Sequence, residues 1–172
     1  MCVQETRWKG NKTKELGDGY KLIFSGANGR GNNGVGIIFD GDTKNKVTSV
    51  CRRSDRVMSV KLQLNEMELN IVSVCAPQVG CQNEEKDRFW RDVELEMLNI
   101  PSEERVFLGG DLNGYIGKGN NEITERKGGK WGVGEEYEEG KRIWPSLIPS
   151  LQNTKPNLTH INVKIEWPKF TS

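Results

Sequence analysis

The chain has 172 residues, a length that suits one compact domain, and a formal net charge of +1. This near-neutral balance excludes a global electrostatic attraction to nucleic acid, so any basic contact surface must be local. No apolar run is long enough to span a bilayer, and the first ten residues carry Glu5, Arg7 and Lys9 in place of an apolar signal segment. We therefore expect an intracellular chain without membrane contacts.

Strands separated by turn signals are predicted in the first half. We expect strands over residues 1–4 and 20–24 with a polar loop between them, and a mostly buried strand over residues 35–39 after a cluster of glycine and asparagine. Residues 57–64 alternate between apolar and polar side chains, which predicts a half-buried strand. Residues 67–74 are expected to be its antiparallel hairpin partner.

One helix is predicted from the spacing of apolar residues. Phe89, Val93 and Met97 recur every four residues and predict a helix over residues 84–99. A strand over residues 105–108 follows and leads directly into Gly109-Gly110-Asp111. Strand, helix and strand in succession predict a layered α/β or α+β domain.

The last part of the sequence is less regular. Residues 117–140 show no period and are expected to form a loop, with a helical start at residues 138–144. We assign residues 1–144 to the domain and residues 145–172 to a divergent tail, in which four prolines argue against a long helix and residues 158–165 suit one strand.

The cysteines do not predict a metal site. Cys2, Cys51, Cys75 and Cys81 show no two-residue spacing, and His160 is the single histidine. A structural zinc site is therefore not expected, and the thiols are expected to be free.

Two strand ends carry oxygen ligands. Glu5 follows the first strand, and Asp111 and Asn113 follow the strand that begins near residue 105. A carboxylate held by a rigid sheet at the edge of a solvated cleft is the kind of ligand that a hard cation such as Mg²⁺ requires. The pattern favours metal-assisted phosphodiester chemistry. Taken alone, Glu5 also suits a polar residue at the end of an edge strand, and the motif at residues 110–114 also suits a turn.

Three motifs in chain order resemble the endonuclease/exonuclease/phosphatase superfamily. They are QETRW at residues 4–8, CAPQ at residues 75–78 and GDLNG at residues 110–114. Within that superfamily, three further segments resemble the apurinic-type endonuclease domain of non-LTR retrotransposons and craniofacial development protein 2-like proteins. These segments are GYKL at residues 19–22, GRG at residues 29–31 and PQVGC at residues 77–81.

The resemblance implies a layered α/β/β/α sandwich, here incomplete at both ends. It implies that Glu5 binds Mg²⁺, with Mn²⁺ as an alternative, that Asp111 orients or deprotonates the attacking water, and that Asn113 positions water and phosphate. Cys75 stands where the family usually has a tyrosine, and a thiol is the weaker hydrogen-bond donor. The family's later aspartate and its terminal Ser-Asp-His motif have no counterpart, so we expect activity far below that of an intact relative.

DNA is the partner that the resemblance implies, through backbone contacts of low specificity and with the chain as a monomer. Candidate contacts are Asn28, Arg52, Arg53 and Arg56. Asn28 equally suits a flexible surface loop, and the three arginines equally suit a solvated strand edge. A nuclear location follows from a DNA substrate.

Three hypotheses follow from the sequence. The first is a magnesium-dependent DNA endonuclease of retrotransposon origin, weak or inactive in this truncated form. The second is a non-catalytic remnant of a domesticated nuclease domain that binds DNA or protein. The third is a truncated product that does not fold stably.

Overall fold

The computed structural model describes residues 1–26, 29, 31–78, 80–113 and 158–164. These residues form two β-sheets, one α-helix and two short 3₁₀ helices. The 3₁₀ helices are η1 (Gly17–Gly19) and η2 (Thr43–Lys46). Asn28 and residues 114–157, which include the expected loop and helical start, lie outside the described part of the chain.

The first sheet is antiparallel and has the strand order β1-β4-β3-β2. Its strands are β1 (Cys2–Gln4), β2 (Lys12–Glu15), β3 (Lys21–Ser25) and β4 (Val35–Phe39). β1 pairs with β4 so that Gln4 lies opposite Val35, which places the Glu5 position at the very end of an edge strand.

The second sheet is mixed and has the strand order β5-β6-β7-β8-β9. Its strands are β5 (Val47–Arg52), β6 (Val57–Leu64), β7 (Met67–Cys75), β8 (Arg105–Asp111) and β9 (Leu158–Lys164). The predicted hairpin is confirmed, with Leu64 opposite Met67 across the turn. β8 runs parallel to β7 and to β9, and Cys75 lies opposite Asp111 at the carboxyl ends of β7 and β8.

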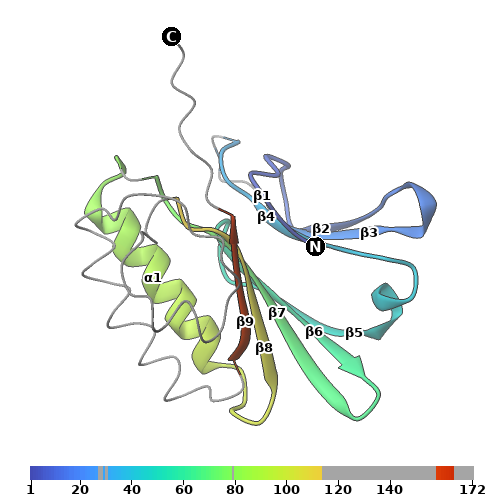
Figure 1. Ribbon diagram of the computed structural model, residues 1–172. Coiled ribbons are helices and arrows are strands. Elements are labelled where there is room, and N and C mark those ends of the chain that lie inside the picture. The colour runs from blue at the N-terminus through green and yellow to red at the C-terminus, as the bar shows by residue number, and fades with distance from the viewer. Residues whose placement is uncertain (27–28, 30, 79, 114–157, 165–172) are drawn as a thin grey trace.

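Helix α1 (Asn83–Leu98) connects β7 to β8 and covers one face of the second sheet, whereas the first sheet lies against the other face (Figure 1). Acidic Glu84 and Glu85 occupy its first turn, where the helix dipole favours negative charge. The helix predicted over residues 84–99 is confirmed, and its observed ends differ by one residue each. The resulting α/β/β layers confirm the α+β class and give three layers of the expected α/β/β/α sandwich.

Two apolar cores lie on opposite faces of the second sheet. The α1 stripe of Phe89, Val93 and Met97 packs on residues of β6, β7 and β8 that point toward the helix. The inward residues of β3 and β4 pack against Met58, Val60 and Leu62 of β6. The second sheet is thus the central layer, and both of its faces exclude water.

Two local expectations are wrong and one strand was not predicted, each for an identifiable reason. β2 lies in the expected polar loop; all four of its side chains are exposed, so no apolar alternation marks it. β5 was not expected, because its apolar residues at positions 47, 50 and 51 do not alternate. β6 is not half-buried, since α1 covers its polar face and buries Val57 and Ser59.

The four cysteines are free thiols in this structure; Cys75 is buried, whereas Cys2, Cys51 and Cys81 are partly buried. The described residues contain no helix of the length and apolarity that crossing a membrane demands.

Candidate functional site

A polar hollow of about 350 Å³ lies at the end of the sandwich where β1, β7 and β8 end. Its lining includes the predicted site residues Glu5, Arg56, Cys75 and Asn113. These positions lie far apart in the sequence, and the two sheets bring them together. Their catalytic and binding roles stay predictions.

Close packing of the two sheets makes this convergence possible. A Cβ at Gly109 of β8 would lie 2.9 Å from Sγ of Cys2 on β1, so a side chain there would push β1 away. Glycine at this position allows the edge strand of the first sheet to lie over β8. Gly109 therefore allows β1, and with it Glu5, to lie close to the end of β8.

The loop after β1 is held by main-chain hydrogen bonds in an unusual conformation. Thr6 N donates to Gly34 O at 3.1 Å, and Arg7 N donates to Asn33 O at 3.0 Å. Asn33 is in turn fixed by its side chain, whose Nδ2 donates to Asp55 Oδ2 at 2.8 Å. The hydroxyl of Thr6 is buried with no partner among the described residues.

Backbone strain is concentrated around the hollow. Six described non-glycine residues have positive φ, and four of them line it: Glu5 (φ 50°), Arg7 (φ 55°), Asn33 (φ 69°) and Asn113 (φ 46°). Left-handed conformations are costly for residues with a side chain, and they cluster at functional sites because the surrounding structure holds them in place. Three separate loops contribute these four residues to one hollow.

The GDLN segment is fixed against the end of β7. Ala76 N donates to Asp111 O at 2.8 Å, and Asn113 N donates to Asp111 Oδ1 at 2.8 Å. The side-chain amide of Asn113 also donates to Ala76 O. Asp111 is the last residue of β8, so its carboxylate belongs to a rigid strand end.

The Cys75 thiol lies among the predicted catalytic groups. Burial raises its pKa to about 11, the negative charges of Asp111 and Glu5 act in the same direction, and the charge of Arg56 opposes them. Cys75 is therefore a neutral thiol at physiological pH, so it does not act as a thiolate ligand or nucleophile.

Arg7 is a charged group of the hollow to which the sequence reasoning gave no role. Its Nη2 lies 2.8 Å from Oε2 of Glu5, in an ion pair whose side chains are 69% and 53% exposed. Glu5 therefore faces solvent and carries a cationic partner. Arg7 stands within the QETRW motif, which is the sequence signal that marks it.

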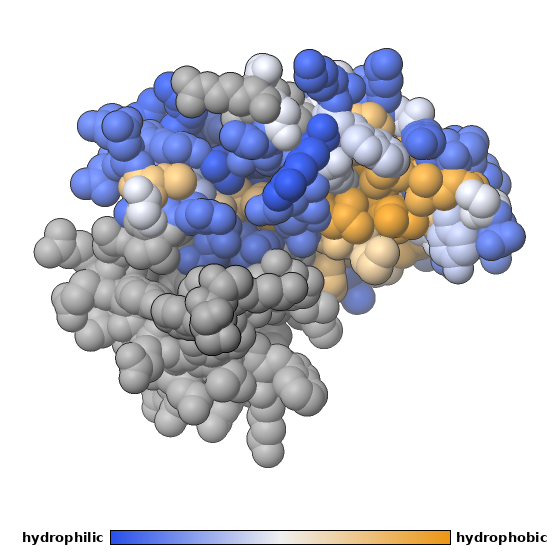
Figure 2. All heavy atoms as spheres, turned by 90° about the horizontal axis from the view of Figure 1, so that it is seen from above, coloured by the Kyte–Doolittle hydropathy of each residue, from blue (hydrophilic) through white to orange (hydrophobic). Residues whose placement is uncertain are grey.

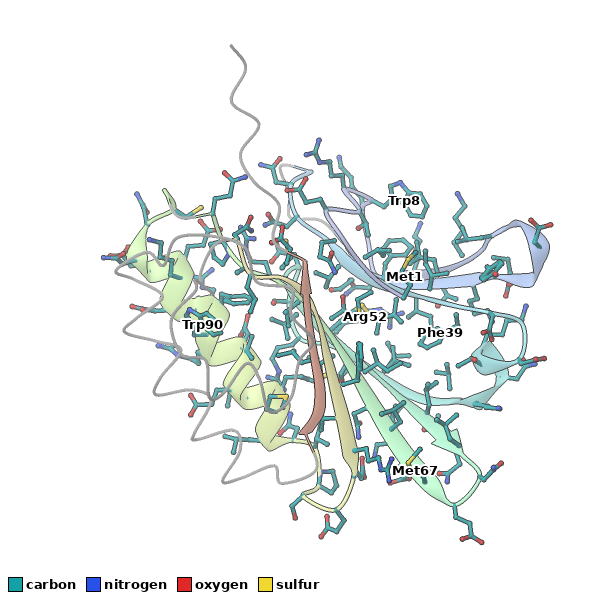
Figure 3. All side chains as sticks on the ribbon, in the orientation of Figure 1. Met1, Trp8, Phe39, Arg52, Met67 and Trp90 are labelled. Carbon is teal, nitrogen blue, oxygen red and sulfur yellow. The ribbon has the colours of Figure 1, made fainter. Side chains whose placement is uncertain are left out.

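The three arginine candidates for DNA contact do not form one surface. Arg52 Nε donates to Phe24 O at 3.0 Å, and Figure 3 shows its side chain between the two sheets. Arg53 pairs with the buried Glu96 of α1 at 2.7 Å. Arg56 donates to Cys75 O at 3.2 Å and pairs with Glu85, so it joins the hollow to the start of α1.

The donors in the hollow suit a hard cation that retains water. Mg²⁺ is usually bound by one or two carboxylates together with waters and substrate phosphate, and the carboxylate and amide oxygens of Glu5, Asn33 and Asn113 are of this type. Within the described ranges no group of three or more His, Cys, Asp or Glu residues is placed to hold a metal ion. Glu5 would therefore hold such an ion with solvent and substrate completing its coordination.

Comparison with known proteins identifies relatives through sequence. The chain is 27% identical to craniofacial development protein 2 of Bos taurus over 143 residues, which are 83% of this chain and 24% of that protein. The Tragulus javanicus protein of the same name is 26% identical over 143 residues. The chain spans about a quarter of the length of these curated relatives. No family model matches it.

Solved structures that overlap with part of the chain include two with TM-scores below 0.5. The endonuclease domain of TRAS1, a telomere-specific non-LTR retrotransposon, overlaps with a TM-score of 0.49 and 20% identity, over 77% of this chain and 53% of that one. Humanized D. rerio TDP2 overlaps with a TM-score of 0.43 and 15% identity, over 64% and 45% of the two chains. The chain is thus similar in sequence to craniofacial development protein 2, the relative that its motifs indicated.

Proposed function

We propose that this chain is a DNA endonuclease domain of retrotransposon origin that hydrolyses phosphodiester bonds with the help of Mg²⁺ or Mn²⁺, at a reduced rate. The observation that carries the proposal is the convergence of four strained residues on one hollow, with Glu5 and Asn113 among them. A cleft that pre-positions carboxylate and amide groups at strand ends suits phosphate chemistry.

Each predicted site residue has a distinct role in this proposal. Glu5 holds the cation, which when bound neutralises charge on a phosphate oxygen. Asp111 is assigned the orientation of the attacking water and the acceptance of its proton. Its carboxylate, at the end of β8, accepts a hydrogen bond from Asn113 N and is not part of the lining of the hollow. Asn113 positions the water and the phosphate through its side-chain amide.

Three contacts argue for a reduced rate. The Glu5 carboxylate is paired with Arg7, which competes with a cation for the same oxygens. The Asn113 amide uses one of its two N–H donors on the Ala76 carbonyl, which leaves a single N–H for a phosphate. Cys75 supplies a neutral thiol where a stronger hydroxyl donor would support the phosphate.

Nicking of supercoiled plasmid by the purified full chain tests the proposal. Glu5→Gln keeps the shape of the side chain but removes its charge, and nicking in Mg²⁺ is expected to fall at least about a hundredfold. Glu66→Gln is the matched control, because Glu66 lies exposed at the β6–β7 turn, away from the hollow. Equal nicking by the Glu5→Gln variant and the wild type would overturn the proposal.

A second function is supported by the same ion pair. A carboxylate neutralised by Arg7 suits a hollow that binds without catalysis, in a remnant that retains DNA or protein as a partner. Cation-independent DNA binding by a chain that does not nick would favour this function. Cooperative unfolding of the purified chain would exclude the hypothesis of an unstable product.

A further inference from the structure

The surroundings of the hollow differ sharply in charge on its two sides. A second hollow of about 760 Å³ adjoins it and shares Asn33, Arg56 and Glu85 with it. The side chains of this second hollow include four carboxylates against two guanidinium groups. They are Asp55, Glu84, Glu85 and Asp92 against Arg56 and Arg88. Phosphates are repelled from this side, so a DNA strand that reaches the hollow must leave it in another direction.

The opposite side begins at Arg7 and carries the densest positive charge of the described chain. Residues 7–14 hold Arg7, Lys9, Lys12 and Lys14 without one carboxylate, and every residue of the segment is exposed. Among the described residues no carboxylate lies within ion-pair distance of the three lysines. This contrasts with Arg53 and Arg56, whose charges are paired with glutamates.

The backbone of this basic segment is fixed. Its first residue is held by the bond from Arg7 N to Asn33 O, and Asn11 Oδ1 accepts from Gly26 N at 2.9 Å. Its last residues belong to β2, where Lys12 lies opposite Phe24 and Lys14 opposite Leu22 of β3. A ligand therefore meets charges on an ordered backbone, which lowers the entropy cost of binding.

Trp8 orients the middle of the segment. Its ring packs edge-on against Phe24 with centroids 5.4 Å apart, and Lys14 Nζ lies 4.5 Å from the centre of the same ring. Figure 3 shows Trp8 on the outer side of the first sheet, away from Trp90 and the helix. Seen from above, apolar side chains gather over the first sheet with hydrophilic side chains around them (Figure 2). The outward placement leaves Trp8 40% exposed, so it borders the charged surface as an aromatic anchor.

We propose that Trp8, Lys9, Lys12 and Lys14 form a surface that binds the DNA backbone, in place of Arg52, Arg53 and Arg56. This surface follows Arg7 of the hollow in the chain and extends to β2 at the far edge of the first sheet. The proposal rests on the proposed function for its choice of DNA as the partner. A charged edge strand also protects a sheet from edge-to-edge pairing, but that role does not require the charge to begin at the hollow. The surface selects for phosphate charge and carries no base specificity.

Binding of fluorescent duplex DNA, followed by anisotropy in EDTA at several salt concentrations, tests this surface without cleavage. The triple variant Lys9→Gln, Lys12→Gln, Lys14→Gln is compared with the control Lys46→Gln, Arg91→Gln, Arg105→Gln, whose side chains are also exposed and whose charge change is the same. The test variant is expected to lose at least about tenfold in affinity at low salt, and its salt slope is expected to fall by about 2.7 if each lysine neutralises one phosphate. The control variant is expected to bind within about twofold of the wild type.

Equal losses in the two triple variants would overturn the proposal, as would unchanged affinity in the test variant or no binding by the wild type at low salt. Unfolding midpoints of both variants must match the wild type, which is expected because all six side chains are exposed. Glu5→Gln separates this surface from the catalytic proposal. Retained binding with unchanged nicking in Glu5→Gln would overturn the nuclease site and leave the DNA surface intact.

Discussion

Replacing Arg53 is expected to destabilise the fold, although its sequence position among Arg52 and Arg56 first indicated a DNA contact. Arg53 Nε donates to Glu96 Oε2 at 2.7 Å, and the Glu96 side chain is 2% exposed. The same carboxylate accepts a hydrogen bond from the hydroxyl of Ser59 and one from Cys51 Sγ at 3.2 Å. This network ties α1 to β5 and β6 through polar groups that the apolar core surrounds.

The magnitude follows from the burial of the two partners. Arg53→Met keeps much of the side-chain volume but leaves the Glu96 carboxylate buried without its cation, and breaking such a pair typically costs about 3–5 kcal/mol. The Arg53 side chain is 20% exposed, so water reaches part of the pair and the lower end, about 3 kcal/mol, applies. Arg53→Met with Glu96→Leu removes both charges and is expected to be more stable than the sum of the single changes indicates.

Urea unfolding followed by far-UV circular dichroism measures this cost. A loss of about 3 kcal/mol with a slope of about 2 kcal/mol/M lowers the midpoint by about 1.5 M. Arg91→Met is the control, because Arg91 is exposed on α1, the helix that carries Glu96. An Arg53→Met midpoint equal to that of the control would refute the structural role and restore Arg53 as a candidate DNA contact.

Two further predictions concern the hollow. Arg7→Gln is expected to tighten Mn²⁺ binding by up to about fivefold, because an exposed ion pair contributes at most about 1 kcal/mol and its loss frees Glu5. Electron paramagnetic resonance of Mn²⁺ measures the affinity. Unchanged or weaker binding would contradict a competition between Arg7 and the cation for the Glu5 carboxylate. The Cys75 thiol has a pKa of about 11 in the folded chain, whereas its ordinary pKa is 9.0. The folded chain therefore keeps a proton that the unfolded chain loses between about pH 9 and 11. The contribution of Cys75 to the free energy of unfolding is complete below pH 9 and falls in this window by up to about 1.4 kcal/mol per pH unit. Urea unfolding across this range is expected to show a shallower pH dependence for Cys75→Ala than for the wild type, and identical slopes would exclude this linkage.

The fold was most predictable where apolar side chains repeat with the period of a helix or a strand, so that one face of the element is buried. The stripe of Phe89, Val93 and Met97 predicts α1, since a helix that covers a sheet must bury one face. β2 was invisible for the opposite reason, because it is held by main-chain pairing with β3 and buries no side chain. The polar face of β6 misled for a third reason: Ser59 is buried because Glu96 of α1 accepts its hydrogen bond, and a sequence pattern does not display such a partner.

The site also has a part that the sequence predicts and a part that it does not. Motifs placed Glu5, Cys75 and Asn113 in chain order, and the structure brings all three to one hollow. The arrangement of their partners depends on positive φ angles at non-glycine residues, which the sequence does not indicate. Arg7 turns back onto Glu5 because both residues have positive φ, and Asn33 from a distant loop holds that turn.

This dependence explains why we place the proposed DNA-binding surface at exposed lysines without a carboxylate partner, and not at the arginine cluster. A basic residue can serve a ligand only if the fold leaves its charge unsatisfied, and the network around Glu96 uses Arg53 as a core component. The strained turn at residues 5–7 has the opposite effect, because it ends β1 beside the hollow and the chain then continues to β2 at the opposite edge of the first sheet. Lys9, Lys12 and Lys14 thereby remain exposed and without a carboxylate partner among the described residues. The same turn thus positions the predicted cation ligand and presents the surface that would hold the strand to be cleaved.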